Sequence, residues 1–155
     1  MKFLRSLDEL GHSLAITQGR IFEKSVDYGI PSYFFIKSFM NSMEAKDLDD
    51  LNLTIVELTE NEIFDIVANK VNIKRGSLLS YSLMRFIGYF YRMFSYLTNM
   101  KSKEIIRLVP INYLVNNFEV LHSYPIDEAV KEVIKNKNIK LLTKEELFKR
   151  LYTLD

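Results

Sequence analysis

Cysteine is absent from the 155 residues of this chain, and histidine occurs only twice. The absence of cysteine excludes a disulfide framework, thiolate metal sites and a cysteine nucleophile. His12 and His122 stand far apart and outside any zinc-protease pattern, and no serine-hydrolase or glycine-rich phosphate-binding motif is present. The sequence therefore predicts no metal, no cofactor and no catalytic residue, and it favours a binding role over an enzymatic one.

Glycine and proline are also scarce, with five and three residues. Several of them stand where a helical chain would turn, at Gly29, Pro31, Gly76, Pro110 and Pro125. Between these breaks, apolar residues recur at helical spacing. The sequence predicts an all-α fold, in which residues 1–155 form one domain of about six or seven helices around a central hydrophobic helix at about 78–99.

Neither a signal peptide nor a membrane span is expected. Asp8 and Glu9 lie where a secretion signal needs an apolar core, which favours a cytoplasmic bacterial protein. The longest apolar window, 78–98, has the length of a membrane span. Arg85 and Arg92 lie inside it, and each would cost a few kcal/mol at the bilayer centre, so we expect no membrane partner.

Charge is balanced over the whole chain but not along it. The formal net charge is +1, from 21 basic and 20 acidic residues, which argues against a dedicated nucleic-acid-binding protein. Two blocks of opposite sign lie next to each other, and they either neutralise each other in the fold or face different partners. The acidic block contains Asp47, Asp49, Asp50, Glu57, Glu60, Glu62 and Asp65; the basic block contains Lys70, Lys74, Arg75, Arg85, Arg92, Lys101, Lys103 and Arg107, with Glu104 as its single acid.

Local patterns predict several helix ends. Thr59 and Glu62 have the spacing of a capping box, and the same spacing recurs after Thr143. Gly11 and Gly19 weaken the first helix, expected at about 4–28, and could split it. The segment 51–58 begins with alternating apolar and polar residues, which is also compatible with a short strand.

The central helix has two different sides when its residues are placed at 100° intervals. One side is apolar and is predicted to face the core; it contains Leu83, Ile87, Phe90, Phe94 and Leu97. The opposite side is called the Tyr/Arg stripe and contains Tyr81, Arg85, Gly88, Tyr89, Arg92 and Tyr96. This stripe is either a structural network of hydrogen bonds and ion pairs or a recognition surface, because Tyr and Arg are frequent at binding sites.

A nucleic-acid interface is a weaker alternative. Residues 102–122 read as a helix, a proline-containing turn and a second helix, which is loosely the spacing of a helix-turn-helix. The second half, 111–122, contains no Lys or Arg, which is unusual for a recognition helix.

Two separated segments resemble a family of small bacterial helical proteins. The first is 19–23 (Gly-Arg-Ile-Phe-Glu) with 27–29, 39–42, Ala45 and 48–49; the second is 88–92 (Gly-Tyr-Phe-Tyr-Arg) with Thr98, 102–105, 121–123, Asp127 and Ala129. Met93, Phe94 and Ser95 replace the Tyr, Trp and His that the family has there. These proteins are similar to partners encoded beside toxin-like genes in toxin–antitoxin or phage-defence loci. The resemblance implies an antitoxin-like binding protein. Its shared residues Arg20, Tyr89, Arg92, Glu104 and His122 then either mark the binding site or form a structural network that buries an arginine.

The leading hypothesis is a non-catalytic module that neutralises a toxin by binding it. The alternatives are a nucleic-acid-associated transcriptional regulator and an enzyme acting on a nucleotide-like small molecule held by Arg85, Arg92 and Tyr89; a homo-oligomer is also compatible with the sequence. The predicted binding residues are Arg20, Tyr81, Arg85, Tyr89, Arg92, Tyr96, Lys103, Glu104 and His122.

Overall fold

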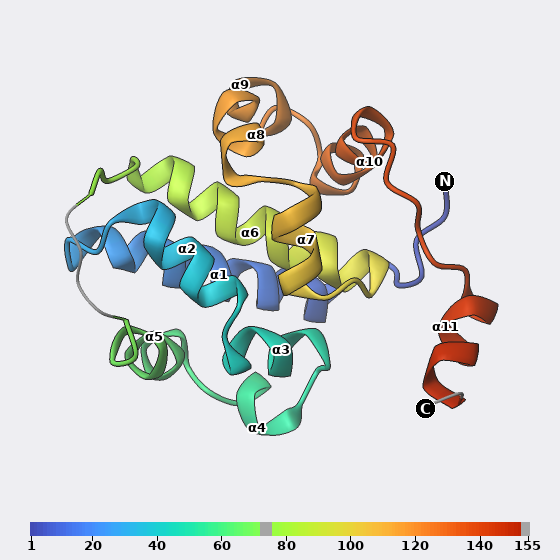
Figure 1. Cartoon of the computed structure of the whole chain (residues 1–155), viewed down its shortest axis with the longest axis horizontal. Helices are drawn as coiled ribbons and strands as arrows, with labels where there is room; N and C mark the ends of the chain where they lie inside the picture. The colour runs from blue at the N-terminus through green and yellow to red at the C-terminus, as the bar shows by residue number, and fades with distance from the viewer. Residues whose placement is uncertain (72–75, 153–155) are drawn as a thin grey trace.

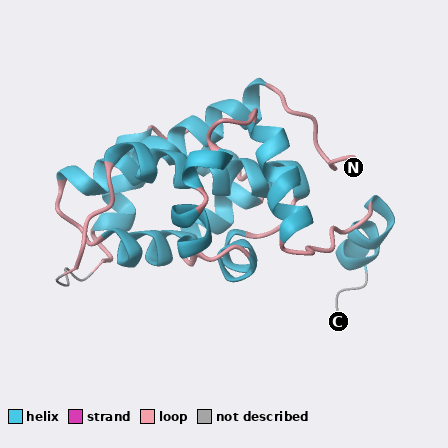
Figure 2. Ribbon diagram, turned by 90° about the horizontal axis from the view of Figure 1, so that it is seen from above, coloured by secondary structure: helices cyan, strands magenta, loops and turns pink. Residues whose placement is uncertain are grey.

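Helices make up the fold, and the parts of the chain that the structure describes contain no strand. The structure is a computed structural model, and it describes residues 1–71 and 76–152. Its helices are α1 (Glu9–Asp27), α2 (Ser32–Met40), α3 (Met43–Asp49), α4 (Leu53–Val56), α5 (Glu60–Ala68), α6 (Tyr81–Thr98), α7 (Ser102–Leu108), α8 (Ile111–Asn116), α9 (Phe118–Leu121), α10 (Ile126–Asn136) and α11 (Lys144–Tyr152). The predicted all-α class is confirmed (Figure 2), although short helices raise their number above six or seven.

The two longest helices, α1 and α6, lie side by side through the middle of the molecule (Figure 1). Glycines allow their backbones to approach closely, because a Cβ built on Gly88 would lie 2.6 Å from the carbonyl oxygen of Gln18. A Cβ on Gly19 would lie 2.8 Å from the carbonyl oxygen of Arg85, and Gly11 faces the ring of Tyr96. Gly11 and Gly19 therefore do not split α1; they form part of its contact with α6.

The remaining helices surround this pair. In Figure 1, α2 and α7 lie across the pair, α3, α4 and α5 lie below it, and α8, α9 and α10 lie on the opposite side of α6. The core between these elements is rich in phenylalanine: Phe22 packs edge-on against Phe35 and Phe39, and Phe90 and Phe94 of α6 are fully buried. The helix α11 stands at the edge of the molecule beside the N-terminal segment.

One local expectation is wrong and two are confirmed. The possible strand at 51–58 is instead the short helix α4, which begins where the Asn52 side chain accepts the Thr54 N–H at 3.1 Å. Both capping interactions of the Thr59–Glu62 box are present at the start of α5, and Thr143 accepts the Glu146 N–H at the start of α11. Alternation over a few residues does not distinguish a strand from one turn of helix.

Removing the Thr59 cap should destabilise the protein modestly. Thr59→Ala leaves the Glu62 N–H without its side-chain acceptor, so we expect the free energy of unfolding to fall by about 1 kcal/mol. Urea denaturation followed by circular dichroism measures this change. Thr54→Ala is the control, because Thr54 is exposed and lies outside the α5 cap; an equal loss in both variants would contradict the assignment of the cap.

The predicted central helix is α6, which begins at Tyr81 after the Ser80 cap and ends at Thr98, before the left-handed Asn99. The segment 102–122 folds as α7, Pro110, α8 and α9, with a break at Asn117, so its second half is two short helices rather than one recognition helix. None of the helices that the structure describes is long and apolar enough to cross a bilayer.

Candidate functional site

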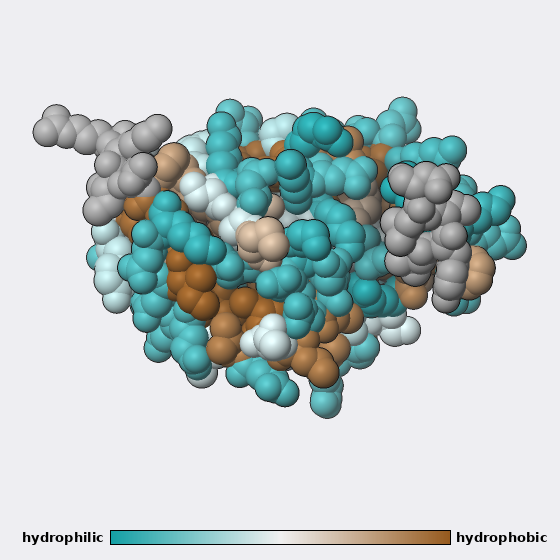
Figure 3. Space-filling model, turned by 60° about the horizontal axis from the view of Figure 1, so that its bottom comes forward, coloured by the Kyte–Doolittle hydropathy of each residue, from teal (hydrophilic) through white to brown (hydrophobic). Residues whose placement is uncertain are grey.

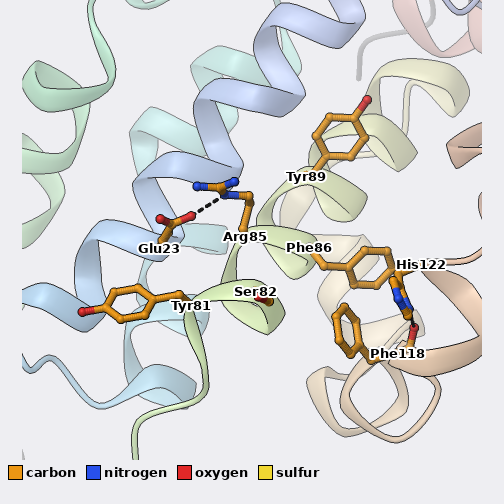
Figure 4. Close-up of a pocket in the computed structure, with 8 residues that line it drawn as sticks. All are labelled: Glu23, Tyr81, Ser82, Arg85, Phe86, Tyr89, Phe118 and His122. Carbon is orange, nitrogen blue, oxygen red and sulfur yellow. Dashed lines mark hydrogen bonds and ion pairs between the residues drawn. The ribbon is translucent and has the colours of Figure 1, made fainter.

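A groove open to solvent runs along the exposed side of α6, between α1 and α9 (Figure 4). It has a volume of about 410 Å³. Four of the predicted binding residues line it together, and we call it the α6 groove. Its lining residues are Glu23 of α1, Tyr81, Ser82, Arg85, Phe86 and Tyr89 of α6, Phe118 of α9, and His122.

The α9 side of the groove is an aromatic wall. Phe86 and Phe118 meet edge to face with ring centroids 5.3 Å apart, and the His122 ring stacks on Phe118 at 4.5 Å. The Nδ1 atom of His122 lies 2.7 Å from the carbonyl oxygen of Phe118. Because a carbonyl oxygen only accepts, Nδ1 carries the proton, and Nε2 of the neutral ring is an acceptor.

The α1 side of the groove is polar and ordered by ion pairing. Nε of Arg85 donates to Glu23, whose carboxylate raises the pKa of the Arg85 guanidinium and keeps it charged. The Tyr81 hydroxyl donates to Asp27 at 2.6 Å, which raises the Tyr81 pKa. Both side chains remain solvent-accessible, with Arg85 exposing 61% of its side chain and Tyr81 49% of its surface.

Tyr89 joins the groove to the start of α1. Its hydroxyl lies 2.7 Å from Nδ1 of His12, and burial raises its pKa. The ring is half-buried and forms part of the groove floor. Ser82 is exposed on the same floor, one helical turn before Arg85 and Phe86. The floor is therefore a stripe of α6 about two turns long, with apolar and polar residues mixed.

Arg92 does not reach the groove, because its side chain is 1% exposed. Its guanidinium donates to Asp49 at 2.6 Å, to Gln18 at 2.7 Å and to the Ser102 hydroxyl at 3.0 Å. Asp49 also accepts the Ser102 N–H at 2.8 Å. Burial lowers the Arg92 pKa while Asp49 opposes this shift, and the guanidinium stays charged. We call these residues the Arg92 network, and they join α1, α3, α6 and α7.

The other predicted residues lie elsewhere on the molecule. The Tyr96 hydroxyl donates to Asp8, the cap of α1, at 2.7 Å, so this end of the stripe is a structural contact. Arg20 is at the surface, where its Nη1 atom lies 3.8 Å from Oε2 of Glu60. Lys103 is exposed on α7, and Glu104 lines a separate cavity beside α11. The structure thus brings together Tyr81, Arg85, Tyr89 and His122.

The two charge blocks neutralise each other in part. Arg92 pairs with Asp49, and Lys101 pairs with Asp50, so both ion pairs join the basic block to the acidic block. Among the described residues, no cation pairs with Asp47, Glu57 or Asp65. Figure 3 turns the underside of Figure 1 forward and shows an apolar patch among largely hydrophilic side chains. Lys74 and Arg75 lie outside the described residues.

Sequence reasoning missed Glu23, Ser82, Phe86 and Phe118 as groove residues. Phe118 lies in the predicted second helix of the 102–122 segment, and Phe86 belongs to neither the apolar side of α6 nor the Tyr/Arg stripe. Their role depends on α9 packing beside α6, which no local pattern encodes. A signal was nonetheless present, because Ser82, Phe86 and Tyr89 recur at helical spacing.

The groove offers aromatic rings, one cation and a few polar atoms, which suits binding. Within residues 1–71 and 76–152, no three histidine or carboxylate side chains converge as a metal site requires. No protein-family model matches the chain, and the comparisons with curated proteins and with solved structures gave no significant match.

Proposed function

We propose that this chain is a non-catalytic protein-binding module of the antitoxin kind, acting in the cytoplasm, and that its partner contacts the α6 groove. The observation that carries the proposal is the convergence of Tyr81, Arg85, Tyr89 and His122 on one open groove with an aromatic wall. Tyr and Arg are the residue types most often found where binding energy concentrates. The sequence resemblance to antitoxin-like proteins supports a toxin as the class of partner.

The form of the groove supports a protein segment as its occupant. Its floor is one stripe of a helix, and α1 and α9 flank it, which is the arrangement that receives an amphipathic helix in many complexes. Further exposed apolar side chains lie close in sequence to the lining residues, with Leu78 before α6, Val120 in α9 and Tyr124 after it. Contact with a partner would cover Phe86 and Phe118 and exclude water from the Arg85–Glu23 pair, which strengthens such a pair.

Blocking the floor of the groove should abolish binding. Ser82→Trp places a large ring on the floor without removing a buried side chain, because Ser82 is exposed. We expect the affinity for the product of the neighbouring gene to fall at least tenfold, and the relief of its toxicity to be lost. Co-purification from cells that express both proteins, followed by titration calorimetry, measures the change.

The matched control is Ser13→Trp, an equal change at an exposed serine of α1 that does not line the groove. Both variants should keep the circular dichroism and melting temperature of the parent chain. No complex with the parent chain would reject the proposed function, and equal binding by both variants would reject the groove. Self-association that Ser82→Trp removes would identify a second copy as the occupant instead.

A further inference from the structure

The α6 groove has the dimensions and the chemistry of a small-ligand site, whether or not a protein also docks there. Its volume of about 410 Å³ lies within the ordinary range for small-molecule sites, roughly 300–1,000 Å³. It is open to solvent, so a ligand can enter without movement of a helix. Its lining is largely apolar, with few polar groups, as ligand sites generally are.

The aromatic wall selects a flat apolar group. Phe86, Phe118 and His122 lie together on one side of the groove (Figure 4), and all three line it. A planar ring placed against them gains both apolar burial and ring–ring contact, which an aliphatic group of equal size does not. The Nε2 atom of His122 adds an acceptor for a ring N–H, because Nδ1 is engaged by Phe118.

Arg85 selects an anionic group. Among the described residues, Nε donates to Glu23, whereas the two terminal amino groups have no hydrogen-bond partner. The contact to Glu23 orders the guanidinium and leaves its terminal edge available for two parallel bonds, the arrangement that binds carboxylates and phosphates. The hydroxyl of Ser82, one helical turn before Arg85, is exposed and lines the same groove.

We infer that the α6 groove binds a planar aromatic anion, with the ring against Phe86 and Phe118 and the anionic group on Arg85. The anionic group is a carboxylate or a phosphate, since both fit the terminal edge of a guanidinium. Binding is non-covalent and involves no reaction. Such a ligand would occupy the surface proposed for the protein partner, but the inference does not require that partner.

Two pairs of compounds distinguish the contribution of the aromatic ring to binding from that of the anionic group. Indole-3-acetate and indole test the carboxylate, and adenosine monophosphate and adenosine test the phosphate. Each is titrated into the purified chain and followed by amide shifts in NMR spectra and by melting temperature. We expect at least one acid to bind roughly tenfold more tightly than its uncharged counterpart, and to raise the melting temperature with concentration.

Variants at exposed positions locate the site. Arg85→Gln should remove the preference for the acid while the uncharged compound binds as before, and Ser82→Trp should abolish binding of both. Arg107→Gln is the matched control, because Arg107 is exposed on α7 and does not line the groove. The inference is overturned if neither acid binds below about 10 mM, if acid and uncharged compound bind equally, or if Ser82→Trp binds as the parent chain does. These titrations use this chain alone, so their failure does not reject protein binding.

Discussion

Asp49→Ala is expected to lower the free energy of unfolding by about 3–5 kcal/mol, the largest effect of any substitution considered for this protein. The variant leaves the Arg92 guanidinium charged, 1% exposed and without its counter-ion. It also removes the acceptor of the Ser102 backbone N–H and of two serine hydroxyls. A buried charge without its counter-ion still has the full desolvation penalty, and no ion pair offsets it.

The adjacent residue provides the control. Asp50→Ala removes a carboxylate of the same type one position later, but Asp50 pairs with Lys46 and Lys101 at the surface, so the loss should stay below about 1 kcal/mol. Urea denaturation of both variants measures the difference. Similar losses in the two variants would contradict the Arg92 network as a buried ion pair.

Gly88→Ala should destabilise the protein by about 2 kcal/mol, although alanine is the better helix former. The new Cβ would lie 2.6 Å from the Gln18 carbonyl oxygen and 2.9 Å from the Cα of Gly19, so α1 and α6 must move apart. Because these neighbours are backbone atoms, no side-chain rotation relieves the contact. Thermal and urea denaturation test this, with Ser82→Ala on the exposed side of α6 as the control expected to change stability by less than about 0.5 kcal/mol.

A second glycine substitution tests whether the effect comes from helix separation. Gly19→Ala meets the Arg85 carbonyl oxygen, and Gly19 lies directly against Gly88. Once one alanine has moved the helices apart, the second alanine should destabilise the protein less. The decrease in the free energy of unfolding of the double variant should therefore be smaller than the sum of the two single decreases. Strict additivity would contradict the close approach of the two backbones.

Features set by neighbouring residues were predictable from the sequence. The Thr59–Glu62 capping box needs only four consecutive residues, and it is formed as predicted. The Leu53–Val56 helix was not predicted, because one turn of helix and a short alternating strand have the same apolar pattern. The apolar side of α6 faces the core as predicted, with Ile87, Phe90, Phe94 and Leu97 buried, because an 18-residue helix repeats its pattern several times.

The sequence did not predict which residues of the Tyr/Arg stripe are buried and which are exposed. Arg92 and Arg85 are seven residues apart on one side of α6, yet one is buried and the other is 61% exposed. The difference comes from α3, whose Asp49 pairs with the Arg92 guanidinium, whereas the Arg85 guanidinium pairs with Glu23 at the edge of α1. These partners are distant in sequence, so the stripe contains both a structural network and a candidate binding site.

An amide NMR spectrum of the labelled chain, bound to the neighbouring gene product, is the sharpest test of whether the partner contacts the α6 groove. We expect the shift changes to centre on residues 81–89 and 118–122, with the Arg85 side-chain Nε–H signal among the most affected. Shift changes confined to α3, α4 and α5, with the groove signals unchanged, would place the interface at the acidic block and contradict partner binding in the α6 groove.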